Sequence, residues 1–124
     1  SGDMEIGMGI HGEPGVRRGK TEPADKVVTE LMDVVVPELK LAKGDEVEVL
    51  INSLGATPLM DLFVMYRKVS HILEAKGIKV HKSFVGSYAS TMNMPGCSVT
   101  LLKVDSELKR LIDLPTNAPY FVQK

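Results

Sequence analysis

EVEVLINSLGATPLMDLFVMYRKVSHILEAKGIKVHKSFV, residues 46–85, is the stretch that decides the fold. Residues 46–51 place apolar side chains on alternate positions, which is typical of a strand. Residues 59–75 carry apolar side chains at helical spacing until Gly77 stops the helix, and residues 78–85 return to a strand pattern. A connection of this length allows a crossover between parallel strands. We therefore predict a right-handed strand–helix–strand unit.

Further elements are expected on both sides of this unit. They are a weak strand over residues 4–11, a polar loop at 17–20, a helix that Thr21 caps and Pro37 limits, a strand over 97–104, and a short helix that Ser106 caps. Thr57 is expected to cap the middle helix, with Pro58 at its first position. The strands at 78–85 and 97–104 are expected to be antiparallel neighbours. The predicted fold is a single α/β domain with a mixed β-sheet of about four strands flanked by helices.

Composition and charge narrow the function classes. At 124 residues the chain has room for one core, and its 44% hydrophobic and 25% charged content is ordinary for a globular domain. A net charge of −1 gives no long-range attraction to nucleic acid or to anionic lipid. No apolar run is long enough for a membrane span, and no signal peptide pattern is present. We therefore expect a cytoplasmic protein that binds neither nucleic acid nor membrane.

Cysteine and histidine are too sparse to predict a metal site. Cys97 is the only cysteine, so an internal disulfide is impossible, and we expect this residue to be a small buried apolar side chain. The three histidines are scattered along the chain, which does not favour a closed Cys/His zinc site. His71 and His81 are expected to face solvent.

The segment GMGIHGEPG, residues 7–15, concentrates features that packing alone does not require. His11 stands at the end of the first expected strand, and Gly9 and Gly12 leave space beside its ring. A neutral imidazole nitrogen is a nucleophile near neutral pH. His11 is therefore a candidate nucleophile, and Glu13 is a candidate for orienting it. The residues alone leave open a plain alternative, in which both are solvated side chains of a surface loop.

Three other features allow both a functional and a structural explanation. The turn at residues 52–58 could bind an anion at a helix N-terminus, or be only a tight turn; it lacks the Gly-Lys-Ser/Thr of a Walker loop. Residues 7–12 match the GxGxxG spacing, but no helix follows directly, so we do not expect a dinucleotide. The basic residues within 17–20 could attract a phosphorylated product or be solvated charges.

Three separated stretches together resemble one known family. MEIGMGIHGEPG (residues 4–15), INSLGATPLMDLF (51–63) and VGSYASTMNMPGCSVTLLKVD (85–105) resemble the carboxy-terminal half of the dihydroxyacetone kinase K subunit and its ATP-fused relatives. The similarity runs in order from Met4 to about Asp105, and GIHGEPG and LGATPL are its specific motifs. It implies that residues 1–124 are a carboxy-terminal, substrate-capturing domain and a fragment of a larger chain.

The resemblance also implies a role for each site residue. In that family the histidine of GIHGEPG attacks the carbonyl carbon of dihydroxyacetone and holds it as a hemiaminal. His11 is the matching position here, with Gly9 and Gly12 expected beside the substrate. A ketone forms this adduct and glycerol does not, so covalent capture would select the ketone more sharply than hydrogen bonds alone. The ring must be unprotonated to attack, so binding is expected to weaken as the pH falls.

The remaining components of such a kinase are expected outside this chain. The family's catalytic Asp and second His lie in its amino-terminal domain, and no position here matches them. The nucleotide and Mg²⁺ are expected on an L subunit or another domain, with ATP or the phosphotransferase system as donor, and no cofactor is expected on this chain. The family suggests a homodimer. An alternative implied function is that of a dihydroxyacetone-sensing co-activator of transcription without kinase activity.

Overall fold

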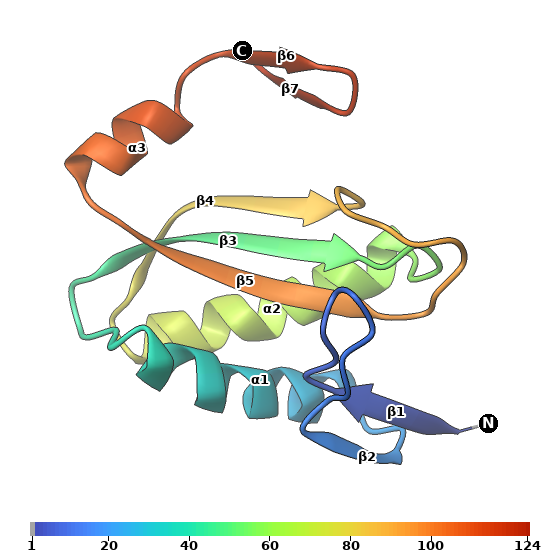
Figure 1. The fold of residues 1–124 in the computed structure, drawn as a ribbon. Helices are drawn as coiled ribbons and strands as arrows, with labels where there is room; N and C mark the ends of the chain where they lie inside the picture. The colour runs from blue at the N-terminus through green and yellow to red at the C-terminus, as the bar shows by residue number, and fades with distance from the viewer. Residues whose placement is uncertain (1) are drawn as a thin grey trace.

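Ten helices and strands follow one another along residues 2–124, the part of the chain that the computed structural model describes (Figure 1). They are β1 (Asp3–Ile6), β2 (Arg17–Lys20), α1 (Ala24–Glu38), β3 (Glu46–Ser53), α2 (Leu59–Ala75), β4 (Lys79–Gly86), β5 (Cys97–Val104), α3 (Ser106–Ile112), β6 (Thr116–Ala118) and β7 (Phe121–Gln123). The α/β class is therefore confirmed.

The main sheet is mixed and has three strands in the order β4-β3-β5. β3 pairs in parallel with β4, as the crossover through α2 predicts, and antiparallel with β5. The prediction that the strands at 78–85 and 97–104 are neighbours is wrong, because β3 lies between them. β3 is buried along most of its length, and a strand of that kind belongs in the middle of a sheet.

The core lies between this sheet and the two long helices, which cover the same face (Figure 1). Val47, Val49 and Ile51 of β3 point into it and are completely buried. α1 and α2 complete it with one apolar stripe each, namely Val28, Met32 and Val36 on α1 and Leu62, Met65, Val69 and Leu73 on α2. The periodicity of the sequence located these buried faces only in part, because Leu59 and Phe63, which also follow the helical spacing of α2, are half-exposed.

The first expected strand does not join the main sheet. β1 ends at Ile6, because Gly7 has a φ of +79° and turns the chain away. β1 instead forms a separate antiparallel hairpin with β2, at residues that were expected to be a polar loop. The sheet of about four strands is thus a three-stranded sheet and two hairpins, the second being β6–β7.

The expected threonine and serine caps are wrong. Pro23 and Pro58 occupy the N-cap positions of α1 and α2, neither with a side-chain cap. Thr21 and Thr57 instead donate their hydroxyls to distant carbonyls. Asp105, not Ser106, caps α3, accepting a 2.8 Å hydrogen bond from the backbone N–H of Leu108.

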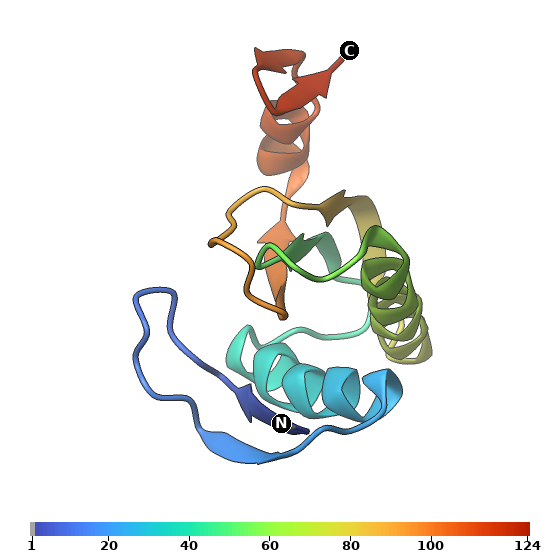
Figure 2. The same cartoon turned by 90° about the vertical axis from the view of Figure 1, so that its right-hand side faces the viewer.

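Residues 106–124, here called the C-terminal arm, comprise α3 and the β6–β7 hairpin. The arm lies on the side of the sheet opposite α1 and α2 and extends from it (Figures 1 and 2). Within the described residues, none of the arm's side chains is buried. No helix within residues 2–124 has the length and apolar character that crossing a bilayer demands.

Candidate functional site

The loop of residues 7–16 carries the GIHGEPG motif and joins β1 to β2. Two hydrogen bonds close its base, since the backbone N–H of Val16 donates to the carbonyl of Ile6 at 2.8 Å and that of Gly15 to Oε1 of Glu5 at 2.7 Å. Gly15 lies so close to the Ile6 carbonyl that a Cβ at this position would overlap it. The loop is thus clamped at its base and projects from the hairpin (Figure 2).

Glu5 is the side chain that makes this clamp. Its carboxylate also accepts a 2.7 Å hydrogen bond from the guanidinium of Arg18. The backbone N–H of Gly15, and after it the Arg18 guanidinium, hold the pKa of Glu5 below its ordinary value of 4.5. The clamp is therefore an ionised carboxylate at neutral pH.

His11 stands at the tip of the loop with its side chain 85% exposed. Its backbone N–H donates to Oε2 of Glu13 at 3.1 Å, and its Nδ1 lies 3.7 Å from Oε1 of the same carboxylate. Glu13 folds over Gly9, where a Cβ would overlap the carboxylate and lie 2.8 Å from the Cβ of Glu13. A Cβ at Gly12, by contrast, would meet no atom within 4 Å, although the φ of +87° favours glycine. The three predicted site residues, Gly9, His11 and Gly12, therefore share one loop tip with open space beside the imidazole.

The basic residues after this loop are engaged in ion pairs. Arg17 bridges the carboxylates of Glu22 and Glu30, at 3.0 Å and 2.6 Å, while Lys20 contacts Asp3 at 3.0 Å. Arg18 is held by Glu5, as described above. These contacts favour the structural explanation of the cluster, in which its charges fix the β1–β2 hairpin to the start of α1.

Two further loops, residues 54–58 and 87–96, follow the carboxyl ends of the parallel strands β3 and β4. Asn52, the penultimate residue of β3, is only 4% exposed. Its side-chain oxygen accepts hydrogen bonds from the backbone N–H groups of Tyr88 and Ala89, and its amide donates to the carbonyl of Ala89 at 2.8 Å. One buried amide thus shapes the loop of residues 87–96. The sequence analysis missed this role, although a polar side chain near the end of a buried strand was a usable signal.

The turn at residues 54–56 is already saturated with hydrogen bonds. The N–H groups of Leu54 and Ala56 donate to the carbonyls of Gly96 and Met94, and that of Gly55 donates to the hydroxyl of Ser53. These three N–H groups are therefore taken up within the loop, which favours the structural explanation for residues 54–56.

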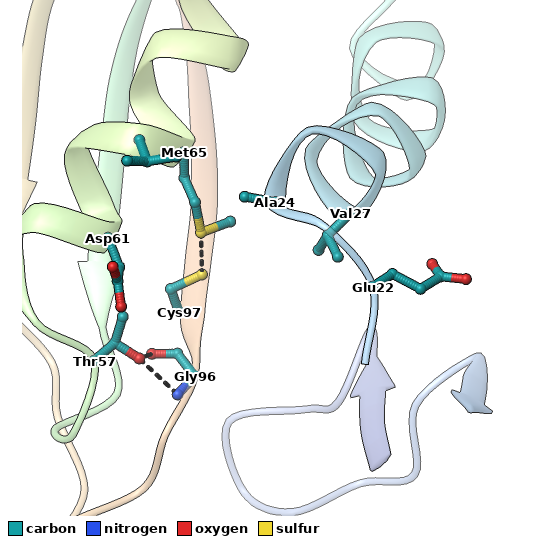
Figure 3. A pocket seen from close by; sticks show the side chains of 9 residues that line it. Glu22, Ala24, Val27, Thr57, Asp61, Met65, Gly96 and Cys97 are labelled. Carbon is teal, nitrogen blue, oxygen red and sulfur yellow. Dashed lines mark hydrogen bonds between the residues drawn. The ribbon is translucent and has the colours of Figure 1, made fainter. Parts of the chain in front are cut away.

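An open cleft of about 290 Å³ lies where α1, α2 and β5 begin (Figure 3). Its lining mixes apolar side chains with the carboxylates of Glu22 and Asp61. Cys97 is half-buried there, its Sγ 2.9 Å from the Sδ of Met65, and burial raises the pKa of its thiol to about 11. The cysteine is therefore a poor nucleophile at neutral pH, as expected for a packing residue. The lining does not include Gly9, His11 or Gly12.

A family model described as the Dak1 domain matches residues 1–120. The chain belongs to the Dak1 family. The resemblance in three separated motifs predicted this membership correctly.

Two Dak1 relatives and one solved structure show the range of the family. The chain is 53% identical to the "PTS-dependent dihydroxyacetone kinase 2, dihydroxyacetone-binding subunit DhaK" of Listeria innocua, covering 97% of this chain and 36% of that protein. It is 38% identical to the rat "Triokinase/FMN cyclase", covering 94% and 21% respectively. The structure of the "Dihydroxyacetone kinase operon co-activator Dha-DhaQ" superposes with a TM-score of 0.87 at 31% identity, covering 98% of this chain and 38% of that one. The chain thus spans about a third or less of the length of these relatives.

Proposed function

We propose that this chain is the carboxy-terminal, substrate-capturing domain of a dihydroxyacetone kinase subunit, in which His11 binds dihydroxyacetone covalently. The observation that supports this role best is the presentation of the imidazole at the tip of a clamped glycine loop, with its side chain 85% exposed. The similarity to the Listeria subunit, whose name states that it binds dihydroxyacetone, supports the choice of substrate.

The proposed capture step is an addition that balances without any further reactant. The lone pair of the unprotonated ring nitrogen forms a bond to the carbonyl carbon, and the π electrons of the carbonyl move to its oxygen. This oxygen takes up a proton while the other ring nitrogen loses one, so the product is a neutral hemiaminal. Held this way, the terminal hydroxyl of the ketone is fixed for phosphoryl transfer.

Glu13 is placed to assist this step. Its carboxylate lies 3.7 Å from Nδ1 of His11. In this proposal the other ring nitrogen, Nε2, is therefore free to attack the ketone. A carboxylate next to Nδ1 favours the tautomer with the proton on that nitrogen, and it can attract that proton as the adduct forms. Glu13 is in this account a positioning residue and not a catalytic one.

The proposal places the rest of the reaction on other parts of the kinase. The loop around His11 is too exposed to enclose a small sugar by itself. The amino-terminal domain of the subunit would therefore complete the pocket, and it would also supply the catalytic acid and base. The nucleotide and Mg²⁺ would reside on an L subunit or domain, as the family resemblance implies. A cytoplasmic homodimer is the corresponding assembly.

A second candidate function uses the same capture step. The likeness to the co-activator structure supports a dihydroxyacetone sensor, in which the bound ketone changes a contact with a transcription factor instead of being phosphorylated. The kinase requires the catalytic Asp and His of the amino-terminal domain, and the sensor does not. Their presence in the full-length protein would support the kinase.

Binding of two ligands of nearly equal shape tests the proposal. We expect the full-length subunit to bind dihydroxyacetone and to bind glycerol at least about 100-fold more weakly, because only the ketone forms the adduct. His11→Ala should remove this preference, whereas His71→Ala, which removes another exposed histidine on α2, should keep it. Isothermal titration calorimetry measures both affinities. An unchanged preference in His11→Ala would rule out the proposed role.

A further inference from the structure

A buried carboxylate without a hydrogen-bond partner lies on the face of the sheet away from the helices. The side chain of Glu48, on β3, is only 7% exposed, and neither of its oxygens has a hydrogen-bond partner among residues 2–124. A buried charge of this kind is costly unless a cation or a proton compensates it. The ring of His81 on β4 lies nearby, with its Nε2 3.9 Å from Oε1 of Glu48.

His81 and its neighbour connect this buried carboxylate to the C-terminal arm. The pairing of β3 with β4 is irregular at this point, and His81 is the extra residue on β4. Its Nε2 lies 2.9 Å and 3.0 Å from the two carboxylate oxygens of Asp113, which ends α3. Lys82 contacts the same carboxylate at 2.9 Å and donates to the side chain of Gln123 in β7 at 3.0 Å. His81 was expected to face solvent, but its side chain is only 24% exposed.

Few other contacts hold the arm on the sheet. Lys109 of α3 pairs with Glu46 at 3.1 Å, and the ring of Phe121 lies 5.3 Å from that of Phe84, centroid to centroid. The arm's described side chains are at most half-buried, with Phe121 also packing against Tyr88 at 6.2 Å between ring centroids, so hydrophobic burial contributes less to its docking than to the core. The cluster around Asp113 is therefore in a position to decide whether the arm stays docked.

The charge of this cluster depends on one proton. Four groups meet here, namely Glu48 from β3, His81 and Lys82 from β4, and Asp113 from the arm; Leu102, the residue of β5 that pairs with Glu48, is apolar. With a neutral imidazole the cluster carries one excess negative charge, and docking the arm brings a second carboxylate toward a buried one. One added proton makes the cluster neutral.

We propose that these residues form a proton-dependent latch, which holds the C-terminal arm on the sheet at mildly acidic pH and releases it as the pH rises.

The direction of the pKa changes agrees with this geometry. Burial, and then the nearby Asp113, raise the pKa of Glu48, so its contribution is present below its ordinary value of 4.5 and is lost as the pH rises through the raised value. Lys82 and His81 lower the pKa of Asp113, so its ion pairs are present above the ordinary value of 3.8 and are lost as the pH falls through the lowered value. Histidine itself changes charge between about pH 5 and pH 8. Docking should therefore be strongest between the lowered pKa of Asp113 and neutral pH.

Backbone ¹⁵N relaxation of residues 116–123 tests the latch in this chain without any ligand. In the wild-type protein the order parameters should be near 0.85 at about pH 5 and fall toward 0.6 at about pH 8. Glu48→Gln removes the buried charge without changing its shape, so the arm should stay ordered at both pH values. His81→Gln removes the imidazole from the cluster and should flatten the pH dependence.

His71→Gln is the matched control, because His71 is an exposed histidine on α2 and should leave the pH dependence as in the wild type. Asp113→Asn removes the arm's charged contact, so this variant should be mobile at both pH values. An arm that is equally ordered at both pH values in the wild type would overturn the latch, as would a full pH dependence in both Glu48→Gln and His81→Gln.

Discussion

Single glycines determine where side chains can lie in the His11 loop. Gly9 is required because Glu13 occupies the space that a Cβ would fill, and Gly15 because the Ile6 carbonyl does. The sequence analysis explained the glycines only as open space beside the ring. The structure shows instead that Gly9 and Gly15 are closely approached by other atoms of the loop, so they fix its shape.

Gly9→Ala should weaken capture of dihydroxyacetone by about 10- to 100-fold, because the displaced Glu13 no longer supports His11 in its orientation. Calorimetric titration of the full-length subunit measures the change. Gly2→Ala is the control, since a Cβ there meets no atom within 4 Å. Equal affinities in the two variants would contradict the role of Glu13.

Glu5 gives the same loop a dependence on pH. Its pKa is lowered by the Gly15 N–H and by Arg18, so the clamp is complete above the ordinary value of 4.5 and is lost as the pH falls through the lowered value. We expect the amide proton of Gly15 to exchange faster in Glu5→Gln than in the wild type near neutral pH, because a neutral amide is a weaker acceptor than a carboxylate. Hydrogen exchange followed by NMR measures this rate. Exchange at the wild-type rate would show that the loop base is closed without Glu5.

At the scale of the elements, the sequence analysis succeeded where hydrophobic periodicity sets the structure. The α1 and α2 stripes, the strands at 46–53 and 97–104 and the parallel crossover follow from the spacing of apolar residues. The neighbours of a strand depend instead on contacts across the sheet, and the β4–β5 pairing was therefore mispredicted. β2 and the β6–β7 hairpin were missed because they are short and carry little apolar patterning.

The side chain of Thr57 joins two loops that the sequence analysis did not connect. Its hydroxyl donates to the carbonyl of Gly96 at 2.7 Å and accepts from the N–H of the same residue at 2.8 Å. Thr57→Val keeps the shape and removes both bonds, so it should lower the free energy of unfolding by about 1–3 kcal/mol. Urea denaturation measures this change. Thr29→Val, at an exposed bond within α1, should cost less than about 1 kcal/mol; equal losses would contradict the role of Thr57.

At the scale of the whole molecule, a buried core supports an exposed loop. The helices and the sheet bury a continuous apolar cluster, yet the imidazole of the site stands in solvent. Family membership could be predicted from the sequence because the motifs are local, whereas the role of His11 stays a prediction. What encloses the ketone could not, because those contacts are made by residues outside this chain in the proposed function.

Leu73→Ala should lower the free energy of unfolding by about 2–5 kcal/mol, because Leu73 is completely buried beneath the sheet. Leu59→Ala, at the half-exposed start of α2, should cost less than about 1 kcal/mol. Chemical denaturation of the 124-residue chain measures both. A small effect of Leu73→Ala would mean that the domain does not depend on this core for its stability.

The proposed covalent bond can be tested by NMR. Full-length subunit with ¹⁵N-labelled histidine is mixed with dihydroxyacetone that carries ¹³C at its carbonyl carbon. We predict a one-bond coupling between this carbon and one ring nitrogen of His11, absent in His11→Ala. A bound ketone whose carbonyl carbon couples to no ring nitrogen in the wild-type protein would contradict the account.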